Sequence, residues 1–256
     1  MNNASIKEDI IFDNVTKTFG KSVALSGLNL KIKKGTVHAL LGHSGAGKTT
    51  SLRLLLGLYL PTTGSVSVLG INPTDEGDKI REMCGVLSES YGLYEQLTVY
   101  DNLRFYAEIY GMSAREYNEK IDFYMSLFEM SNKKWDIIKG FSRGEKLRVA
   151  IIRAILHEPK LLILDEPSNG LDPVNLIRLR DEIKKLTDSG TTVVLTTHNL
   201  KETEKMADYI SILKSGKNLL TISMEELKTD EKYKDDKGNF DLEKFYLDFD
   251  SRTVSN

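Results

Sequence analysis

Residues 42–50 read Gly42-His43-Ser44-Gly45-Ala46-Gly47-Lys48-Thr49-Thr50, which matches the pattern G-x-x-x-x-G-K-[ST] without a gap. The preceding apolar run, Val37–Leu41, predicts a strand that ends at the loop, and the pattern predicts a helix that begins near Lys48. Glycines in such a loop let backbone N–H groups turn inward around a phosphate chain, and the helix N-terminus adds a positive dipole end. The sequence therefore predicts a nucleoside triphosphate site whose binding loop, the P-loop, contains all nine residues.

Two side chains of the P-loop have predicted roles in the chemistry. Lys48 is expected to reach the β- and γ-phosphates of the nucleotide, and the Thr49 hydroxyl is expected to ligate Mg²⁺. The alternative is a glycine-rich turn that binds nothing, but the strand, the loop, the lysine and the threonine all occur in the required order.

Composition and charge limit the classes of protein that this chain can belong to. Its 256 residues could form one large domain or two small ones, and the formal net charge of −2 argues against a nucleic-acid-binding role held by phosphate contacts. The single cysteine, Cys84, cannot form an internal disulfide. No segment approaches the ~20 apolar residues that cross a bilayer, and residues 1–9 are polar. We therefore expect a soluble, cytoplasmic protein whose membrane role, if any, comes through a partner.

The order of apolar runs predicts an α/β fold. Strands are expected over residues 10–12, 27–32, 37–41, 65–69, 161–164, 192–196 and 209–213, and helices over 101–110, from 113, from about 144 and over 176–186. The later apolar runs are uninterrupted, which is typical of parallel strands covered on both faces. We expect a P-loop NTPase fold with a mostly parallel core sheet, an N-terminal antiparallel β part and a helical subdomain inserted at about residues 89–140. This domain would span residues 1–230.

The remaining residues, 231–256, are interpreted as a charged C-terminal tail. Residues 229–238 are expected to be loosely ordered because they are almost entirely polar, and an amphipathic segment follows over 240–249.

The strand at residues 161–164 ends in two acids, Asp165 and Glu166. Adjacent side chains of an extended chain point to opposite sides, so Asp165 can face the Mg²⁺ held by Thr49 while Glu166 faces the γ-phosphate and its attacking water. His198 follows the next strand and would sit near the γ-phosphate, because the carboxyl ends of parallel strands meet at one sheet edge. There it would hold the attacking water or Glu166 in place. Glu166, His198 and Lys48 are therefore the predicted catalytic residues.

The stretch 141–148 opens a helix and can be interpreted in two ways. Ser142 and Glu145 have the spacing of a capping box, which would make Ser142 an ordinary N-cap. The same helix N-terminus could instead present Ser142 and backbone N–H groups to a phosphate. The motif alone leaves both interpretations open.

With these motifs in order, residues 11–216 resemble the ATP-binding subunit of an ABC transporter. The resemblance rests on the P-loop, the strand ending in Asp165 and Glu166, residues 168–172 in place of the D-loop, His198 as the switch histidine, and residues 141–148 as the signature sequence. It implies ATP and Mg²⁺ as cofactors and Phe19 as the aromatic side chain that stacks on adenine. Packing in the core is the alternative for Phe19.

The resemblance also implies a mechanism and partners. Two such domains, as a homodimer or a heterodimer, would pack head to tail around two ATP molecules. Ser142 and Gly144 would complete the partner's site, and Asp172 would contact across the interface. Hydrolysis would reopen the dimer, and the helical insertion would pass that motion to transmembrane permease subunits on the inner face of the membrane.

The chain departs from the family's pattern at four positions. Arg143, Glu145 and Leu147 replace usual signature residues, and Glu89 stands where the family usually has a glutamine near Mg²⁺. These departures resemble the branch that exports drugs, peptides or polymers, so we expect export and an active ATPase.

Other classes fit less well. A P-loop GTPase would need Asn-Lys-x-Asp, which residues 132–135 do not supply, and a small-molecule kinase would not need residues 142–148. A soluble ABC-type ATPase with a non-transport role and a binding-only regulatory subunit remain as alternatives.

Overall fold

The structure is a computed structural model that describes residues 7–88, 90–235 and 238–254. A six-stranded sheet forms its centre, in the order β5-β6-β7-β3-β8-β9. These strands are β3 (Val37–Leu41), β5 (Cys84–Leu87), β6 (Leu161–Asp165), β7 (Thr192–Thr196), β8 (Tyr209–Lys214) and β9 (Lys217–Ser223). All neighbours pair in parallel except β9, which is antiparallel to β8.

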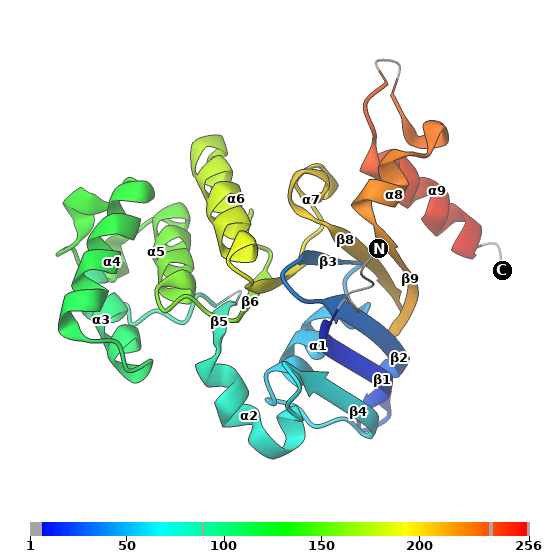
Figure 1. The fold of residues 1–256 in the computed structure, drawn as a ribbon, viewed down its shortest axis with the longest axis horizontal. Helices are drawn as coiled ribbons and strands as arrows, with labels where there is room; N and C mark the ends of the chain where they lie inside the picture. The colour runs from blue at the N-terminus through cyan, green and yellow to red at the C-terminus, as the bar shows by residue number, and fades with distance from the viewer. Residues whose placement is uncertain (1–6, 89, 236–237, 255–256) are drawn as a thin grey trace, which may run out of the picture.

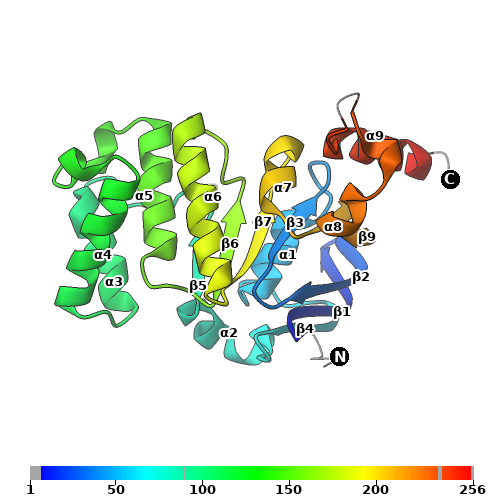
Figure 2. The same ribbon diagram turned by 45° about the horizontal axis from the view of Figure 1, so that its top comes forward.

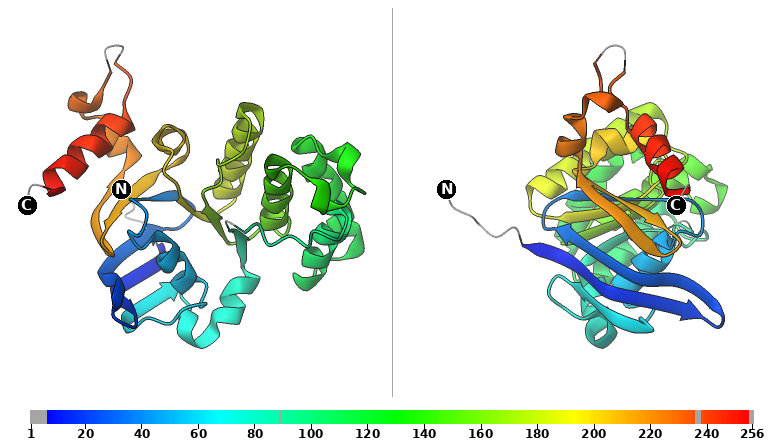
Figure 3. Two further views of the ribbon diagram at one scale, coloured as in Figure 1. Left: turned by 180° about the vertical axis from the view of Figure 1, so that it is seen from behind. Right: turned by 90° about the vertical axis from the view of Figure 1, so that its right-hand side faces the viewer.

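The N-terminal part forms a second, antiparallel sheet in the order β2-β1-β4. It contains β1 (Glu8–Phe19), β2 (Ser22–Lys33) and β4 (Thr63–Val68). In the end-on view of Figure 3, the long strands β1 and β2 extend below the larger sheet. The predicted combination of a mostly parallel core sheet and an antiparallel N-terminal part is confirmed.

Alternate residues of the central strands enter two different hydrophobic clusters. In β6, Leu161 and Ile163 join the cluster between the two sheets, whereas Leu162 and Leu164 join the cluster beneath the helices. This alternation is what two-sided burial of a parallel strand requires, and it explains why the run contains no polar residue. Helix α1 (Lys48–Leu55) contributes Leu52 and other leucines to the first cluster, so the P-loop helix lies between the sheets.

Helix α2 (Pro73–Glu82) buries Ile80 in the cluster between the sheets, and the remaining helices cover the far side of the central sheet or form the inserted subdomain. They are α3 (Val99–Ile109), α4 (Ala114–Leu127), α5 (Arg143–Ile155), α6 (Pro173–Asp188), α7 (Leu200–Met206), α8 (Met224–Lys228) and α9 (Leu242–Val254), with short 3₁₀ turns at Ser131–Lys133, Ile138–Gly140 and Glu231–Tyr233. Helices α3, α4 and α5 gather at one end of the molecule, and α9 lies at the opposite end (Figures 1 and 2). Within the described residues, no helix is long and apolar enough to cross a membrane.

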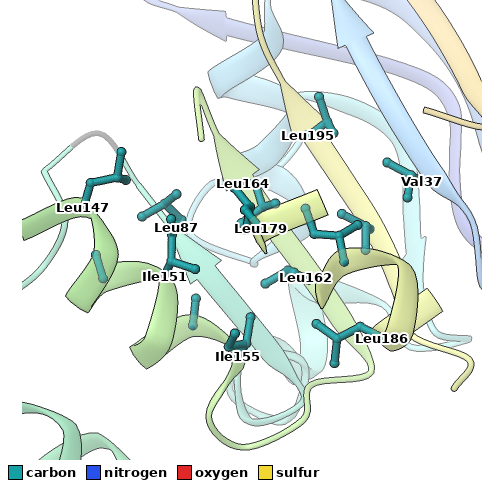
Figure 4. Packing of buried hydrophobic residues seen from close by; sticks show 14 of the residues in the cluster. Val37, Leu87, Leu147, Ile151, Ile155, Leu162, Leu164, Leu179, Leu186 and Leu195 are labelled. Carbon is teal, nitrogen blue, oxygen red and sulfur yellow. The ribbon is translucent and has the colours of Figure 1, made fainter. Parts of the chain in front are cut away.

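Helix α5 joins the inserted subdomain to the core. Its residues Leu147, Ile151 and Ile155 pack against the central sheet and α6 (Figure 4). In its last turn, the almost buried Arg153 donates hydrogen bonds to the backbone carbonyls of Val86, Tyr91 and Gly92, at 2.6–2.7 Å. Burial of this guanidinium is tolerated because carbonyl oxygens replace its water. Arg153 therefore ties α5 to the connection between β5 and α3.

Several elements differ from the expectations. Strands β1 and β2 are longer than the predicted strands, and no predicted element corresponds to the strands β5 and β9 or to the helices α2, α7 and α8. Helix α2 had a readable signal, because Asn72 caps it by accepting from the Thr74 N–H and Pro73 occupies its first turn.

The C-terminal segment agrees with the expectations only in part. Residues 231–233, which were expected to be loosely ordered, form a 3₁₀ turn, and Lys234 pairs with Phe240. Helix α9 overlaps the predicted amphipathic segment at residues 240–249 and buries Leu242 and Phe245. Residues 236 and 237 lie outside the described residues. Apolar side chains at helical spacing anchor the segment although its surface is charged.

The buried imidazole of His38 makes stability depend on pH. His38 in β3 is 1 % exposed, its Nε2 lies 2.8 Å from Ser211 Oγ, and burial lowers its pKa from 6.5 to about 3. Between these values the unfolded chain binds a proton that the folded chain does not, so the free energy of unfolding falls as the pH falls. We expect His38→Gln to show a shallower decline than wild type when urea unfolding is measured from pH 6.5 downward. If the free energy of unfolding declined equally with pH in both proteins, His38 would not be the source of this pH dependence.

Candidate active site

The P-loop leaves β3 and winds into α1 through glycines whose positions exclude larger residues. Gly42 has φ of +152°, and a Cβ there would lie 2.4 Å from the Leu213 carbonyl oxygen. Gly47 has φ of +104°, and its Cβ would lie 2.6 Å from a methyl of Leu25. Contacts this short would displace backbone or core atoms, so the loop's shape depends on these two glycines.

Lys48, the first residue of α1, lies across its own loop. Its Nζ donates to the carbonyl oxygens of Gly42, at 2.6 Å, and His43, at 3.1 Å. Partial burial lowers the pKa of Lys48, while the nearby carboxylates of Glu166 and Asp165 act in the opposite direction. The ammonium is therefore held over the space that the loop encloses, where charge-assisted bonds to phosphate oxygens would exceed those to neutral carbonyls.

Asp165 and Glu166 lie at the carboxyl end of β6, as predicted. Asp165 accepts a hydrogen bond from the hydroxyl of Thr196 at the end of the neighbouring strand β7. Glu166 has φ of +53°, a left-handed conformation that costs a non-glycine residue roughly 1–2 kcal/mol. Its N–H donates to the Thr196 carbonyl at 3.0 Å, which holds this turn in place. The hydrogen bonds to Thr196 therefore hold both acidic residues at the end of β6.

His198 reaches Glu166 from the loop after β7. Its Nδ1 lies 3.0 Å from Glu166 Oε1, and the Nδ2 of Asn169 lies 3.5 Å from the other carboxylate oxygen. The His198 side chain is 70 % exposed, so it can meet a ligand as well as hold Glu166. This contact agrees with the expectation that His198 holds either the attacking water or Glu166 in place.

A cavity of about 970 Å³ unites these groups. It is lined by the whole P-loop together with Ser22, Val23, Ala24, Leu41, Tyr91, Arg143, Asp165, Glu166, Asn169, Thr197, His198, Leu200 and Tyr246. Its volume lies in the range of small-molecule sites. Every predicted residue of the P-loop, both acids and the histidine therefore face one space.

The other predicted residues that the structure describes do not line this cavity. Phe19 ends β1 and is 44 % exposed, with its ring 5.1 Å from that of Tyr59 in an edge contact. Its hairpin neighbours Ser22 and Val23 line the cavity instead. Phe19 is not buried in the core, and its role toward adenine stays a prediction. Glu89 lies outside the described residues.

Ser142, Gly144 and Asp172 lie at two helix N-termini. Ser142 forms the predicted capping box, since its hydroxyl accepts from the Glu145 N–H at 3.3 Å while Glu145 accepts from the Ser142 N–H at 2.8 Å. Hydrogen bonds from Lys133 and Ser142 lower the pKa of Glu145 to about 2. Asp172 caps α6 by accepting from the N–H groups of Val174 and Asn175.

The signature and D-loop segments touch each other. A Cβ on Gly144 would lie 2.8 Å from the carbonyl oxygen of Gly170. Because the backbones approach this closely, any side chain at position 144 would push the segments apart.

Among the lining residues with no predicted place in the nucleotide site are Arg143 and Tyr246. Arg143 was recognised only as a departure from the signature, and its Nε lies 3.2 Å from the hydroxyl of Tyr91. Tyr246 belongs to the predicted amphipathic segment at residues 240–249, and no local motif connects that segment with a nucleotide.

The fold and this cavity define a P-loop nucleotide-binding domain. The sequence model described as "ABC transporter" matches residues 25–169. An uncharacterised ABC transporter ATP-binding protein of Methanocaldococcus jannaschii is 40 % identical over 212 residues, which cover 83 % of this chain and 76 % of that protein. The chain belongs to the ABC transporter family, as an ATP-binding component.

Two further similarities extend the comparison. The bacitracin transport ATP-binding protein of Enterococcus faecalis is 36 % identical over 223 residues, covering 86 % of this chain and 71 % of that protein. A dimeric ATP-binding cassette in a post-hydrolysis state, bound to ADP and Pi, superposes with a TM-score of 0.77 at 28 % identity, covering 84 % of this chain and 98 % of that one. ATP binding and hydrolysis are therefore properties of the family to which this chain belongs.

Proposed function

We propose that this chain is the Mg²⁺-dependent ATPase of an exporter and acts on separate membrane-spanning subunits at the inner face of the membrane. The observation that carries the proposal is the convergence of Lys48, Asp165, Glu166 and His198 on the cavity beside the P-loop. A binding-only domain would not need a histidine held 3.0 Å from a carboxylate in that cavity.

The residues present fit a magnesium ion. Thr49 and Asp165 both line the cavity and offer hard oxygen ligands. Within the part of the chain that the structure describes, no group of three or more His, Cys, Asp or Glu side chains could hold a metal. Mg²⁺ typically uses one or two carboxylates together with substrate phosphates, so such a cluster is not required. When bound, the ion would neutralise charge that develops on the phosphates.

The chain's own groups account for the rest of the chemistry. Lys48 would bind the β- and γ-phosphates, and the helix dipole of α1 would add to that attraction. Glu166 would orient or deprotonate the attacking water, and His198 would fix the Glu166 carboxylate through its 3.0 Å contact. Catalysis would then consist mainly of positioning and charge stabilisation.

We propose that two nucleotide-binding domains share their sites. Ser142 and Asp172 are exposed and do not line their own chain's cavity, which leaves them available to a partner domain. The dimeric relative bound to ADP and Pi supports this arrangement. In a closed dimer, Ser142 and Gly144 would complete the partner's phosphate site, and Asp172 would contact across the interface.

The inserted subdomain offers a surface for the membrane subunits. Tyr94, Phe105 and Ile109 are exposed on or beside α3. Trp135 and Ile137 are also exposed, and they lie between the 3₁₀ turns at residues 131–133 and 138–140. We propose that these exposed apolar side chains contribute to an interaction surface. Export is favoured because relatives carry names concerning bacitracin transport and daunorubicin resistance.

Affinity capture from detergent-solubilised native membranes tests the transport role. We expect a multi-span membrane protein to co-purify with the chain, and Ile109→Lys, which charges the α3 surface, to reduce its recovery about ten-fold. Leu58→Lys, at a similarly exposed apolar site at the end of α1, is the matched control and should leave recovery unchanged. Capture of soluble proteins alone would instead support a non-transport ATPase.

A further inference from the structure

The nucleotide cavity has one wall from the far end of the chain. Tyr246 of α9 lines it together with the P-loop residues, although α9 lies beyond the residues 25–169 matched by the family. Figure 2 shows α9 at the end of the molecule opposite α3, α4 and α5. The helix therefore approaches the cavity from the side away from the signature segment.

Helix α9 is seated firmly enough to form a wall. Leu242 is fully buried and Phe245 is 6 % exposed, both in the main hydrophobic cluster. The ring of Tyr233 meets that of Phe245 edge-on, with centroids 5.1 Å apart, and the Leu242 N–H donates to a carboxylate oxygen of Glu204 at 3.1 Å. These contacts fix the first turns of α9 against α7 and place the next turn beside the P-loop.

A polar cluster connects α9 directly to the P-loop. Asp250 accepts a hydrogen bond from Lys214 at 3.1 Å and lies 3.6 Å from the Nε2 of His43, the second residue of the P-loop. Hydrogen bonding to Lys214 is the main cause that lowers the pKa of Asp250. The ring of His43 also lies 6.2 Å from that of Tyr246, in an edge orientation. Helix α9 thus contacts His43 of the P-loop twice, through the carboxylate of Asp250 and through the ring of Tyr246.

Tyr246 has the chemistry of a ligand contact. Its ring is partly buried, and burial together with the charge of Asp250 raises the pKa of its hydroxyl. The phenol is protonated at neutral pH, as in an ordinary tyrosine, and the ring is the group that we expect to contact the ligand. A rigid aromatic side chain also supplies contact area at a small cost in conformational entropy.

We propose that Tyr246 contacts the bound nucleotide and that Asp250, through Lys214 and His43, positions α9 for this contact. This inference rests on the proposed function, since it adds a residue to the same nucleotide site. The C-terminal segment would then belong to the binding site, and nucleotide affinity would depend on the seating of α9.

Calorimetric titration of the full-length chain with ADP and with MgATP tests the proposal. We expect Tyr246→Ala to raise the dissociation constant about five-fold, the loss of one aromatic contact. Tyr246→Phe keeps the ring and should stay within about two-fold of wild type, and Asp250→Asn should weaken binding about two-fold. Leu247→Ala, on the exposed side of the same helix, is the matched control and should bind like wild type.

The outcomes separate this inference from the function on which it rests. Wild-type protein that binds neither nucleotide would contradict the proposed function, whereas equal dissociation constants for wild type and Tyr246→Ala would overturn the role of Tyr246. Tighter binding by Asp250→Asn would show that the carboxylate repels phosphate, which would overturn its positioning role.

A fluorescence variant gives a readout that does not depend on affinity. Trp135 is the chain's single tryptophan, so Tyr246→Trp in a Trp135→Phe background places the only indole at the cavity wall. We expect saturating ADP to shift its emission, and unchanged emission at saturation would overturn the contact.

Discussion

Replacing Glu166 with glutamine is expected to reduce ATP hydrolysis by on the order of a hundred-fold to ten-thousand-fold, with ATP binding retained. The amide keeps the size of the side chain and can still meet His198 Nδ1 across the 3.0 Å contact, but it cannot accept a proton from water. Phosphate release measured at saturating MgATP gives the turnover, and titration of the same variant gives its affinity. Because hydrolysis would no longer reopen the closed dimer, we also expect an ATP-bound dimer to accumulate. Size-exclusion chromatography would detect it.

Glu225→Gln makes the same chemical change at an exposed position in the first turn of α8 and should hydrolyse ATP like wild type. An unchanged basal rate in Glu166→Gln would remove Glu166 from the chemical step. Wild-type protein that binds ATP without measurable turnover would favour the binding-only regulatory role.

Lys48→Met is expected to weaken ATP binding by about ten- to a hundred-fold, because a charged hydrogen bond contributes about 1.5–3 kcal/mol. In the structure, the Lys48 ammonium donates to the carbonyls of Gly42 and His43, so it gives up these neutral partners for phosphate oxygens when nucleotide binds. Methionine preserves the unbranched side chain but offers no donor and no charge. Equilibrium binding of a fluorescent ATP analogue at fixed ionic strength measures the loss directly.

The matched control is Lys201→Met, which removes an exposed ammonium from α7. Its binding should equal that of wild type, which excludes a general effect of lost positive charge. Retained affinity in Lys48→Met, with correct folding, would contradict the assigned role of the P-loop lysine.

The site residues that could be predicted from the sequence belong to short local motifs. The P-loop glycines, Lys48, and the pair Asp165 and Glu166 could be identified because backbone geometry and strand alternation determine where each group points. The placement of His198 needed one further assumption, that the strands before Asp165 and His198 are parallel neighbours, and the register of β6 with β7 confirms it.

The rest of the site depends on tertiary contacts that no local pattern reveals. Tyr246 reaches the cavity only because Leu242 and Phe245 anchor α9 in the hydrophobic core. In the sequence, the charged residues 229–238 that precede this helix suggested a tail instead. Phe19 shows the opposite limit. The family resemblance identified the residue, but the direction of its ring depends on the Tyr59 contact.

The three hydrogen bonds of Arg153 give α5 a mechanical property. Helix α5 begins beside Ser142 and ends beside Arg153, and its 13 residues correspond to a rod of roughly 20 Å. If the buried Arg153 guanidinium lost its carbonyl partners, it would be left without solvation. Separating α5 from the connection between β5 and α3 would therefore cost considerable free energy. A displacement of that connection would therefore move the whole of α5, including its opposite end, where Ser142 is exposed.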